Sequence, residues 1–236
     1  MKLEEHLNGL VQRLSSAAGQ NLVSVVLHGS AAADDFQPEF SDVNILAVVD
    51  KISVPAMQTL APVLAWWTGL GHPAPLLFTA NELQAVADVF PIEMFDIKQR
   101  HRILHGKDPF QDLEVPMALH RVQLEHEIRT KLLLLRQHYL SIAGDDAKLR
   151  HLMLDSVSNF LALFRHTLIA LGEAPPHNKA EVAQRIAAKL GFDSQPLQQL
   201  LDVRQHKLKA ETLDVNKMFA GYLQAIEAVV EAVDKL

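Results

Sequence analysis

The chain has 236 residues, of which 49% are apolar, so it is long enough to bury a core in one large or two small domains. It has no cysteine, which excludes disulfides, zinc–thiolate sites and a cysteine nucleophile. Its formal net charge of −6 argues against binding of bulk nucleic acid.

Residues 1–112 switch repeatedly between helical and strand periods. An apolar residue at every third or fourth position from Leu3 to Leu14 predicts a helix, and its early acidic residues do not fit a signal peptide. Thr79 and Glu82 have the spacing of a capping box, which predicts a helix start. The elements expected in this half are helices over 3–14, 54–67, 81–89 and 98–106 and strands over 21–29, 41–50, 75–79 and 90–97.

No strand pattern follows residue 112, and helical patterns take over. Glycines at 144 and 172 end the first two of them. Short connections between such helices predict an antiparallel bundle. The sequence therefore predicts an α+β fold, with a small mixed β-sheet domain over residues 1–112 and an all-α helical bundle over residues 113–236. The helices are expected over 116–144, 145–172, 179–191, 194–208 and 213–236.

The location and charge of the chain give two further expectations. No apolar run is long enough to cross a bilayer, and a chain without cysteine is compatible with a reducing compartment, so we expect a cytoplasmic protein without membrane attachment. Residues 1–112 hold 7 Lys and Arg against 13 Asp and Glu, so the net acidity lies in the N-terminal half. Carboxylates gathered there would suit a metal ion better than a nucleic-acid backbone.

The stretch VVLHGSAAADDFQPEFSDVNILAVVD, residues 25–50, contains the residues that indicate a chemistry. Gly29 and Ser30 lie between a predicted strand and a helix, where backbone N–H groups and a hydroxyl can meet a phosphate. Asp42 and Asn44 are two residues apart, so on a strand they face the same side and can offer oxygen ligands to a hard cation. An ordinary tight turn and a polar strand start would explain the same residues.

The combination of these motifs resembles the DNA polymerase β-like nucleotidyltransferase superfamily. Its signature is a Gly-Ser followed about ten residues later by Asp-x-Asp or a close variant on the next strand, as in LHGS and SDVNILAVV here. The segment FPIEMFDIKQRHRILHGKDPF is similar to bacterial members that place a third carboxylate on a later strand. The motifs cover residues 20–112, whereas residues 113–236 resemble kanamycin nucleotidyltransferase-like proteins only in being a helical bundle.

The resemblance implies a Mg²⁺-dependent nucleotidyltransferase that moves a nucleoside monophosphate from an NTP to a hydroxyl of a small molecule or a macromolecule. Gly29 and Ser30 would hold the triphosphate. Asp42 and Asn44, with a third carboxylate, would bind one or two Mg²⁺ ions, one activating the attacking oxygen and the other steadying the pyrophosphate. The acceptor is expected in the cleft between the two domains.

Glu93 and Asp96 are both candidates for the third, catalytic carboxylate. On one regular strand they would face opposite sides, so only one could face Asp42. Glu93 lies between apolar neighbours, where a metal would compensate its charge, and Asp96 could instead cap the following helix. We therefore favour Glu93 as the metal ligand and keep Asp96 as the alternative.

Asn44 departs from the family pattern, which has a second aspartate at this position. An amide oxygen can coordinate a cation but carries no charge to offset the repulsion between two dications. Two outcomes stay open: a slow enzyme with a degenerate one-metal site, or a catalytically inactive nucleotide-binding or protein-interaction module.

Three other patterns give weaker hypotheses. His101 and His105 would be one turn apart on the predicted helix, a spacing that can grip zinc. No cysteine and no obvious third ligand stand nearby, so we expect two exposed polar residues instead. Arg121 and His126 fit the R-x4-H pattern of HEPN-type ribonucleases, or else a solvated helix face. The wide apolar faces of the bundle helices predict a bundle core, or a homodimer seam.

Overall fold

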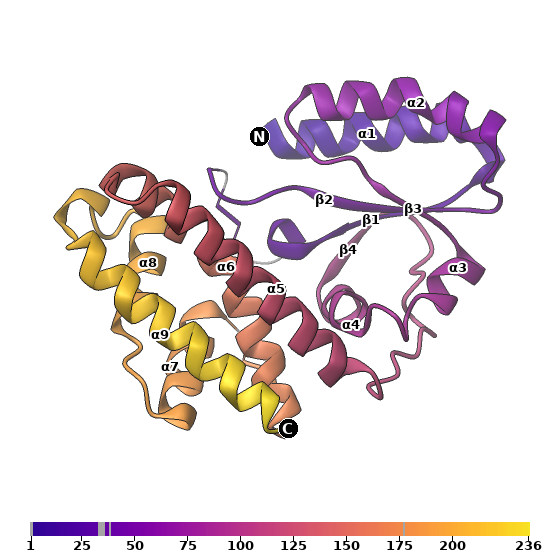
Figure 1. The fold of residues 1–236 in the computed structure, drawn as a ribbon. Helices are drawn as coiled ribbons and strands as arrows, with labels where there is room; N and C mark the ends of the chain where they lie inside the picture. Colours follow the sequence, from indigo (N-terminus) through magenta and orange to yellow (C-terminus); the bar gives the residue numbers. More distant parts are fainter. Residues whose placement is uncertain (1, 33–35, 38, 177) are drawn as a thin grey trace. The chain divides into compact units, whose positions relative to one another are not determined.

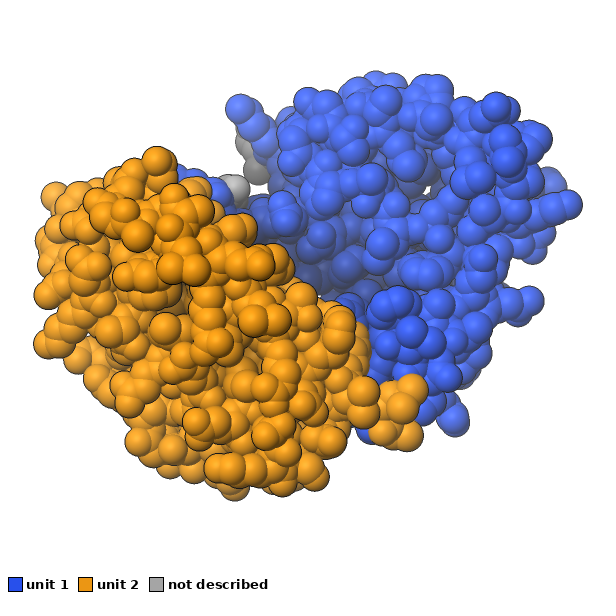
Figure 2. All heavy atoms as spheres, in the orientation of Figure 1, with its two compact units in different colours: residues 1–117 blue, residues 118–236 orange. Residues whose placement is uncertain are grey.

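The computed structural model describes residues 2–32, 36–37, 39–176 and 178–236. The chain divides into two compact units, Met1–Met117 and Ala118–Leu236 (Figures 1 and 2). The first unit combines a small sheet with helices and the second is helical, which confirms the predicted α+β class. Within the described ranges, no helix is both long and apolar enough to cross a membrane.

The first unit is built on a four-stranded mixed sheet with the strand order β3-β2-β1-β4. β1 runs antiparallel to β2 and to β4, and β2 runs parallel to β3. Most side chains of the two central strands are buried on both faces, which explains their nearly continuous apolar sequence. The strands are β1 (Leu22–His28), β2 (Asn44–Val49), β3 (Leu76–Thr79) and β4 (His101–Gly106).

Helices cover both faces of this sheet (Figure 1). On one face, α1 (Lys2–Ala18) and α2 (Val54–Gly69) bury a core that includes Leu27, Ile45 and Trp67. The opposite face is covered by α3 (Ala80–Ala85) and α4 (Pro91–Gln99), whose core includes Val26, Leu46 and Met94. The predicted capping box at the start of α3 is confirmed, because the Thr79 hydroxyl accepts from the Glu82 N–H and the Glu82 carboxylate accepts from the Thr79 N–H.

The prediction was wrong for residues 90–106, where strand and helix are exchanged. Residues 90–97 fall mainly in α4, because Pro91 in the first turn needs no N–H bond and its fixed φ suits a helix. The next segment forms β4, which pairs with β1 from Ser24↔Gly106 to His28↔His101. This pairing satisfies backbone groups along β1 that would otherwise be an open sheet edge, and it overrides the local helical pattern.

The second unit contains the five predicted helices. α6 lies at the centre and contacts all four of the others, and it buries apolar residues such as Val157 and Phe164 on several sides. Asp145, Asn178 and Asp214 cap the starts of α6, α7 and α9 by accepting a backbone N–H. The helices are α5 (His120–Ser141), α6 (Asp146–Ala170), α7 (Lys179–Leu190), α8 (Gln195–Arg204) and α9 (Val215–Asp234).

Candidate functional site

The Gly29–Ser30 turn closes β1 at one end of the sheet. Gly29 has φ +73°, in the left-handed region that glycine adopts without strain. The turn leads into a short 3₁₀ segment, η2 (Gly29–Ala32), rather than the helix expected from the sequence. Gly29 is exposed and Ser30 half-buried, so a ligand can reach both residues.

Asn44 lies directly beside this turn. It is the first residue of β2 and is paired with His28, the last residue of β1. A Cβ placed on Gly29 would lie 3.0 Å from Nδ2 of Asn44, so the amide packs against the glycine. The structure therefore brings together Gly29 and Asn44, which the sequence had linked only by motif.

Asp42 precedes β2 instead of lying on it, so the argument from strand alternation does not apply to this residue. Asp42 is exposed. The antiparallel pairing of β1 and β2 sends the chain at Asp42 and the turn at Gly29 to the same end of the sheet.

His72 lies within electrostatic range of Asp42 and contacts a second histidine, His6. His6 Nδ1 and His72 Nε2 are 3.0 Å apart. Burial lowers the pKa of His72 and His6 lowers it further, whereas Asp42 acts in the opposite direction. Sequence reasoning missed these histidines because they come from α1 and the loop after α2, far from the motif.

Glu93 and Asp96 do not lie on a strand. Both belong to α4, where residues three apart share a side of the helix, so the premise that they face opposite ways was wrong. Glu93 is exposed, so the argument that a buried charge there needs a metal also fails. In the described part of the chain, no three His, Asp or Glu side chains are grouped to hold a metal ion. A catalytic role for either carboxylate stays a prediction.

Two histidines extend from Asn44 across the sheet. His28 is paired with Asn44 on one side and with His101 on the other. Burial, together with the nearby His101, lowers the pKa of His28 to about 4, so His28 is neutral at neutral pH. Nε2 of His28 is buried and finds no hydrogen-bond partner among the residues described. The sequence signal for this row was the position of His28 directly before Gly29.

The zinc hypothesis for His101 and His105 is not supported. Both residues lie on β4, where four residues span about 13 Å, too far to grip one ion together. His101 instead contacts the Ile97 carbonyl at 2.8 Å and Asp108 at 3.2 Å.

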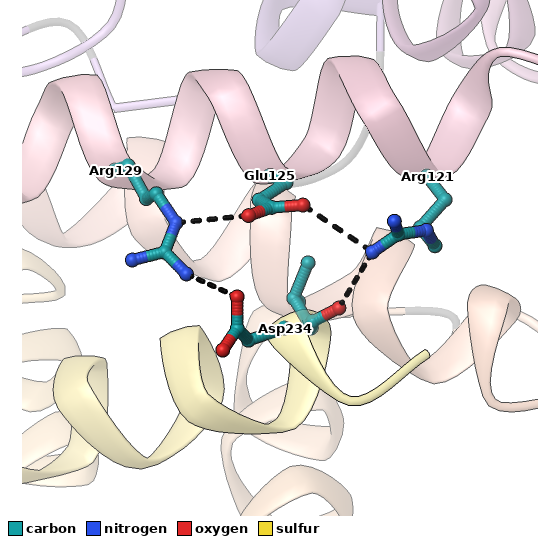
Figure 3. Close-up of polar contacts among 5 residues, drawn as sticks. Arg121, Glu125, Arg129 and Asp234 are labelled. Atoms are coloured by element: carbon teal, nitrogen blue, oxygen red, sulfur yellow. Dashed lines mark hydrogen bonds and ion pairs between the residues drawn. The ribbon is translucent and has the colours of Figure 1, made fainter.

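Arg121 of the R-x4-H pattern belongs to a polar network that joins α5 to α9 (Figure 3). Its guanidinium donates to Glu125 and to the Val233 carbonyl near the end of α9. Arg129 bridges the same Glu125 to Asp234. His126 is 74% exposed and lies 3.7 Å from Glu127. Arg121 therefore has a structural role in the bundle.

The chain combines a mixed four-stranded sheet, a Gly-Ser turn at the end of β1 and a helical second unit. No protein-family model matches the sequence, and no curated protein is similar to it by sequence. The chain is similar in structure to spectinomycin adenyltransferase AAD(9) from Enterococcus faecialis, solved with ATP and spectinomycin. The TM-score is 0.60 at 14% sequence identity, and the match covers 98% of this chain and 99% of that one. At this identity the similarity establishes the fold.

Proposed function

We propose that the chain is a Mg²⁺-dependent nucleotidyltransferase that moves a nucleoside monophosphate from an NTP to a hydroxyl of a small molecule or a macromolecule. The observation that carries this proposal is the turn at Gly29 and Ser30, packed against Asn44 at the sheet end to which the chain at Asp42 also runs. It occurs within a nucleotidyltransferase fold that spans 98% of the chain.

The residues at this end of the sheet divide into hydrogen-bond donors and oxygen ligands. The Gly29 N–H and the Ser30 hydroxyl would donate to phosphate oxygens. The Asp42 carboxylate offers oxygen ligands and a single negative charge, which fits one Mg²⁺ completed by phosphate and water. When bound, Mg²⁺ would neutralise phosphate charge that otherwise repels the acceptor oxygen.

In the transfer itself, the acceptor oxygen bonds to the α-phosphorus and the bond from that phosphorus to pyrophosphate breaks. The acceptor proton must pass to a base. Glu93 and Asp96 are the proposed bases because they lie on α4, which covers the sheet face that carries Leu46. Asn44 is two residues from Leu46 on β2, so its side chain faces the same side of the sheet.

A second candidate function is a nucleotide-binding module without catalysis. It is favoured by Asn44 in place of a carboxylate and by the lack of a three-ligand group within the described residues. Such a protein would bind an NTP at the turn and release no pyrophosphate.

The two functions are separated by incubating the purified protein with labelled ATP, GTP, CTP or UTP, Mg²⁺ or Mn²⁺, and hydroxyl acceptors, with spectinomycin as the first. Pyrophosphate release and transfer of label are measured, together with nucleotide binding by calorimetry. Acceptor-dependent release supports the enzyme, binding without release supports the module, and no binding of any nucleotide contradicts both.

A matched pair of variants tests whether turnover depends on Asp42. Asp42→Asn should lower turnover by about 100-fold or more, because it removes the charged cation ligand. Asp50→Asn makes the same change at the exposed opposite end of β2 and should leave turnover unchanged. Equal losses in both variants would count against the assigned site.

A further inference from the structure

Asn44, His28 and His101 form a row across three strands beside the phosphate-binding turn. They are paired residue to residue on β2, β1 and β4. They are two residues from Leu46, Val26 and Ile103, which all pack in the core under α3 and α4, so the three side chains face that same side. The three side chains therefore lie on the sheet face covered by α3 and α4, at the end of the sheet where the turn begins.

The ring nitrogens of His101 and Nε2 of His28 are not placed to bind a cation at the turn. Nδ1 of His101 lies 2.8 Å from the Ile97 carbonyl and Nε2 lies 3.2 Å from an Asp108 oxygen. Both ring nitrogens of His101 therefore already have a partner in the structure. Nε2 of His28 is buried, out of reach of an ion that arrives with a nucleotide.

Asn44 presents the nitrogen of its amide to the turn. Nδ2 is the atom that a Cβ on Gly29 would approach to 3.0 Å. An amide N–H₂ donates hydrogen bonds and cannot bind a cation, whereas it pairs well with a phosphate oxygen. Asn44 is half-buried, so a ligand at the turn can reach it.

We propose that Asn44 binds the nucleotide as a hydrogen-bond donor to its phosphates, and that the site accordingly holds one divalent cation, at Asp42, instead of two. This inference rests on the proposed function, because it takes an NTP as the ligand of the turn. Its consequence is that part of the affinity for the triphosphate does not depend on metal. An aspartate at position 44 would replace that donor by a negative charge, which repels phosphate unless a second cation is present.

The test is calorimetric titration of the full chain with ATP, in EDTA and in Mg²⁺, together with a count of bound Mn²⁺ per ATP by electron paramagnetic resonance. The wild-type protein should bind ATP measurably in EDTA and hold one Mn²⁺ per nucleotide. Asn44→Asp should weaken binding in EDTA by about tenfold or more and raise the count to two. Asn159→Asp, the same change at an exposed position of α6, should alter neither value.

The outcomes separate this inference from the proposed function. Two Mn²⁺ per ATP on the wild-type protein, or equal ATP affinity of wild type and Asn44→Asp in EDTA, would overturn the inference alone. No ATP binding in either medium would overturn the proposed function as well. If Asn44→Asp fails to fold, Asn44→Ala removes the donor without adding charge, and it should still weaken binding in EDTA; unchanged affinity would overturn the inference.

Discussion

Gly29 meets two separate constraints at the end of β1. Its φ of +73° costs a residue with a Cβ about 1–2 kcal/mol. A Cβ there would also press on the Asn44 amide at 3.0 Å. A side chain at this position therefore strains the turn and displaces the residue beside it.

Gly29→Ala should lower the free energy of unfolding by about 1–3 kcal/mol and also weaken ATP binding. Gly172→Ala is the matched control, because Gly172 has φ +82° but a Cβ there would meet nothing within 4 Å. The control should show the conformational cost alone and unchanged ATP affinity. Denaturant unfolding and calorimetry measure both quantities, and unaltered ATP affinity in Gly29→Ala would contradict the role of the turn.

His28 makes stability depend on pH. The pKa of this residue is 6.5 in the unfolded chain, and burial with the nearby His101 lowers it to about 4 in the folded chain. Between these values the unfolded state binds more protons, so the free energy of unfolding should fall as pH is lowered through this window, by up to roughly 3 kcal/mol. His28→Gln should flatten this dependence in denaturant unfolding; parallel curves for the two proteins would show that His28 is not its source.

At the scale of elements, β4 and α4 are the two for which the local pattern of apolar residues predicted the wrong secondary structure. The apolar residues of segment 90–97 fit a buried strand, and only Pro91 pointed to a helix start. The segment 98–106 was assigned to a helix, yet its backbone completes the ladder along β1. The pairing partner lies more than seventy residues earlier in the chain, so no local period could identify it. Where the signal was local, as in the capping box at Thr79, the prediction was correct.

Gly106 is required where β4 meets β1. Its φ is +76°, and a Cβ there would overlap the Val23 carbonyl oxygen at 1.9 Å. Gly106→Ala should therefore lower the free energy of unfolding by about 2–4 kcal/mol, whereas Gly191→Ala, with φ +77° and open space, should cost only about 1 kcal/mol. Equal costs in denaturant unfolding would mean that β4 does not approach β1 in this way.

At the scale of the whole molecule, composition and periodicity were enough to predict a mixed sheet followed by a helical bundle. Long apolar stripes on helices and continuous apolar runs on central strands can be recognised from the local sequence alone, so those elements were predicted correctly. The candidate site was predicted less well. Its motif residues Gly29 and Asn44 do come together, but the flanking row of His28 and His101 depends on strand pairing that only the structure reveals.

The assigned site is tested most directly by a crystal structure of the protein grown with ATP and Mn²⁺, with the ion located by its anomalous scattering. We expect phosphate oxygens within hydrogen-bond distance of the Ser30 hydroxyl and a single Mn²⁺ on the Asp42 carboxylate. ATP ordered elsewhere on the molecule, or Ser30 and Asp42 directed away from each other with neither touching the ligand, would contradict the assigned site.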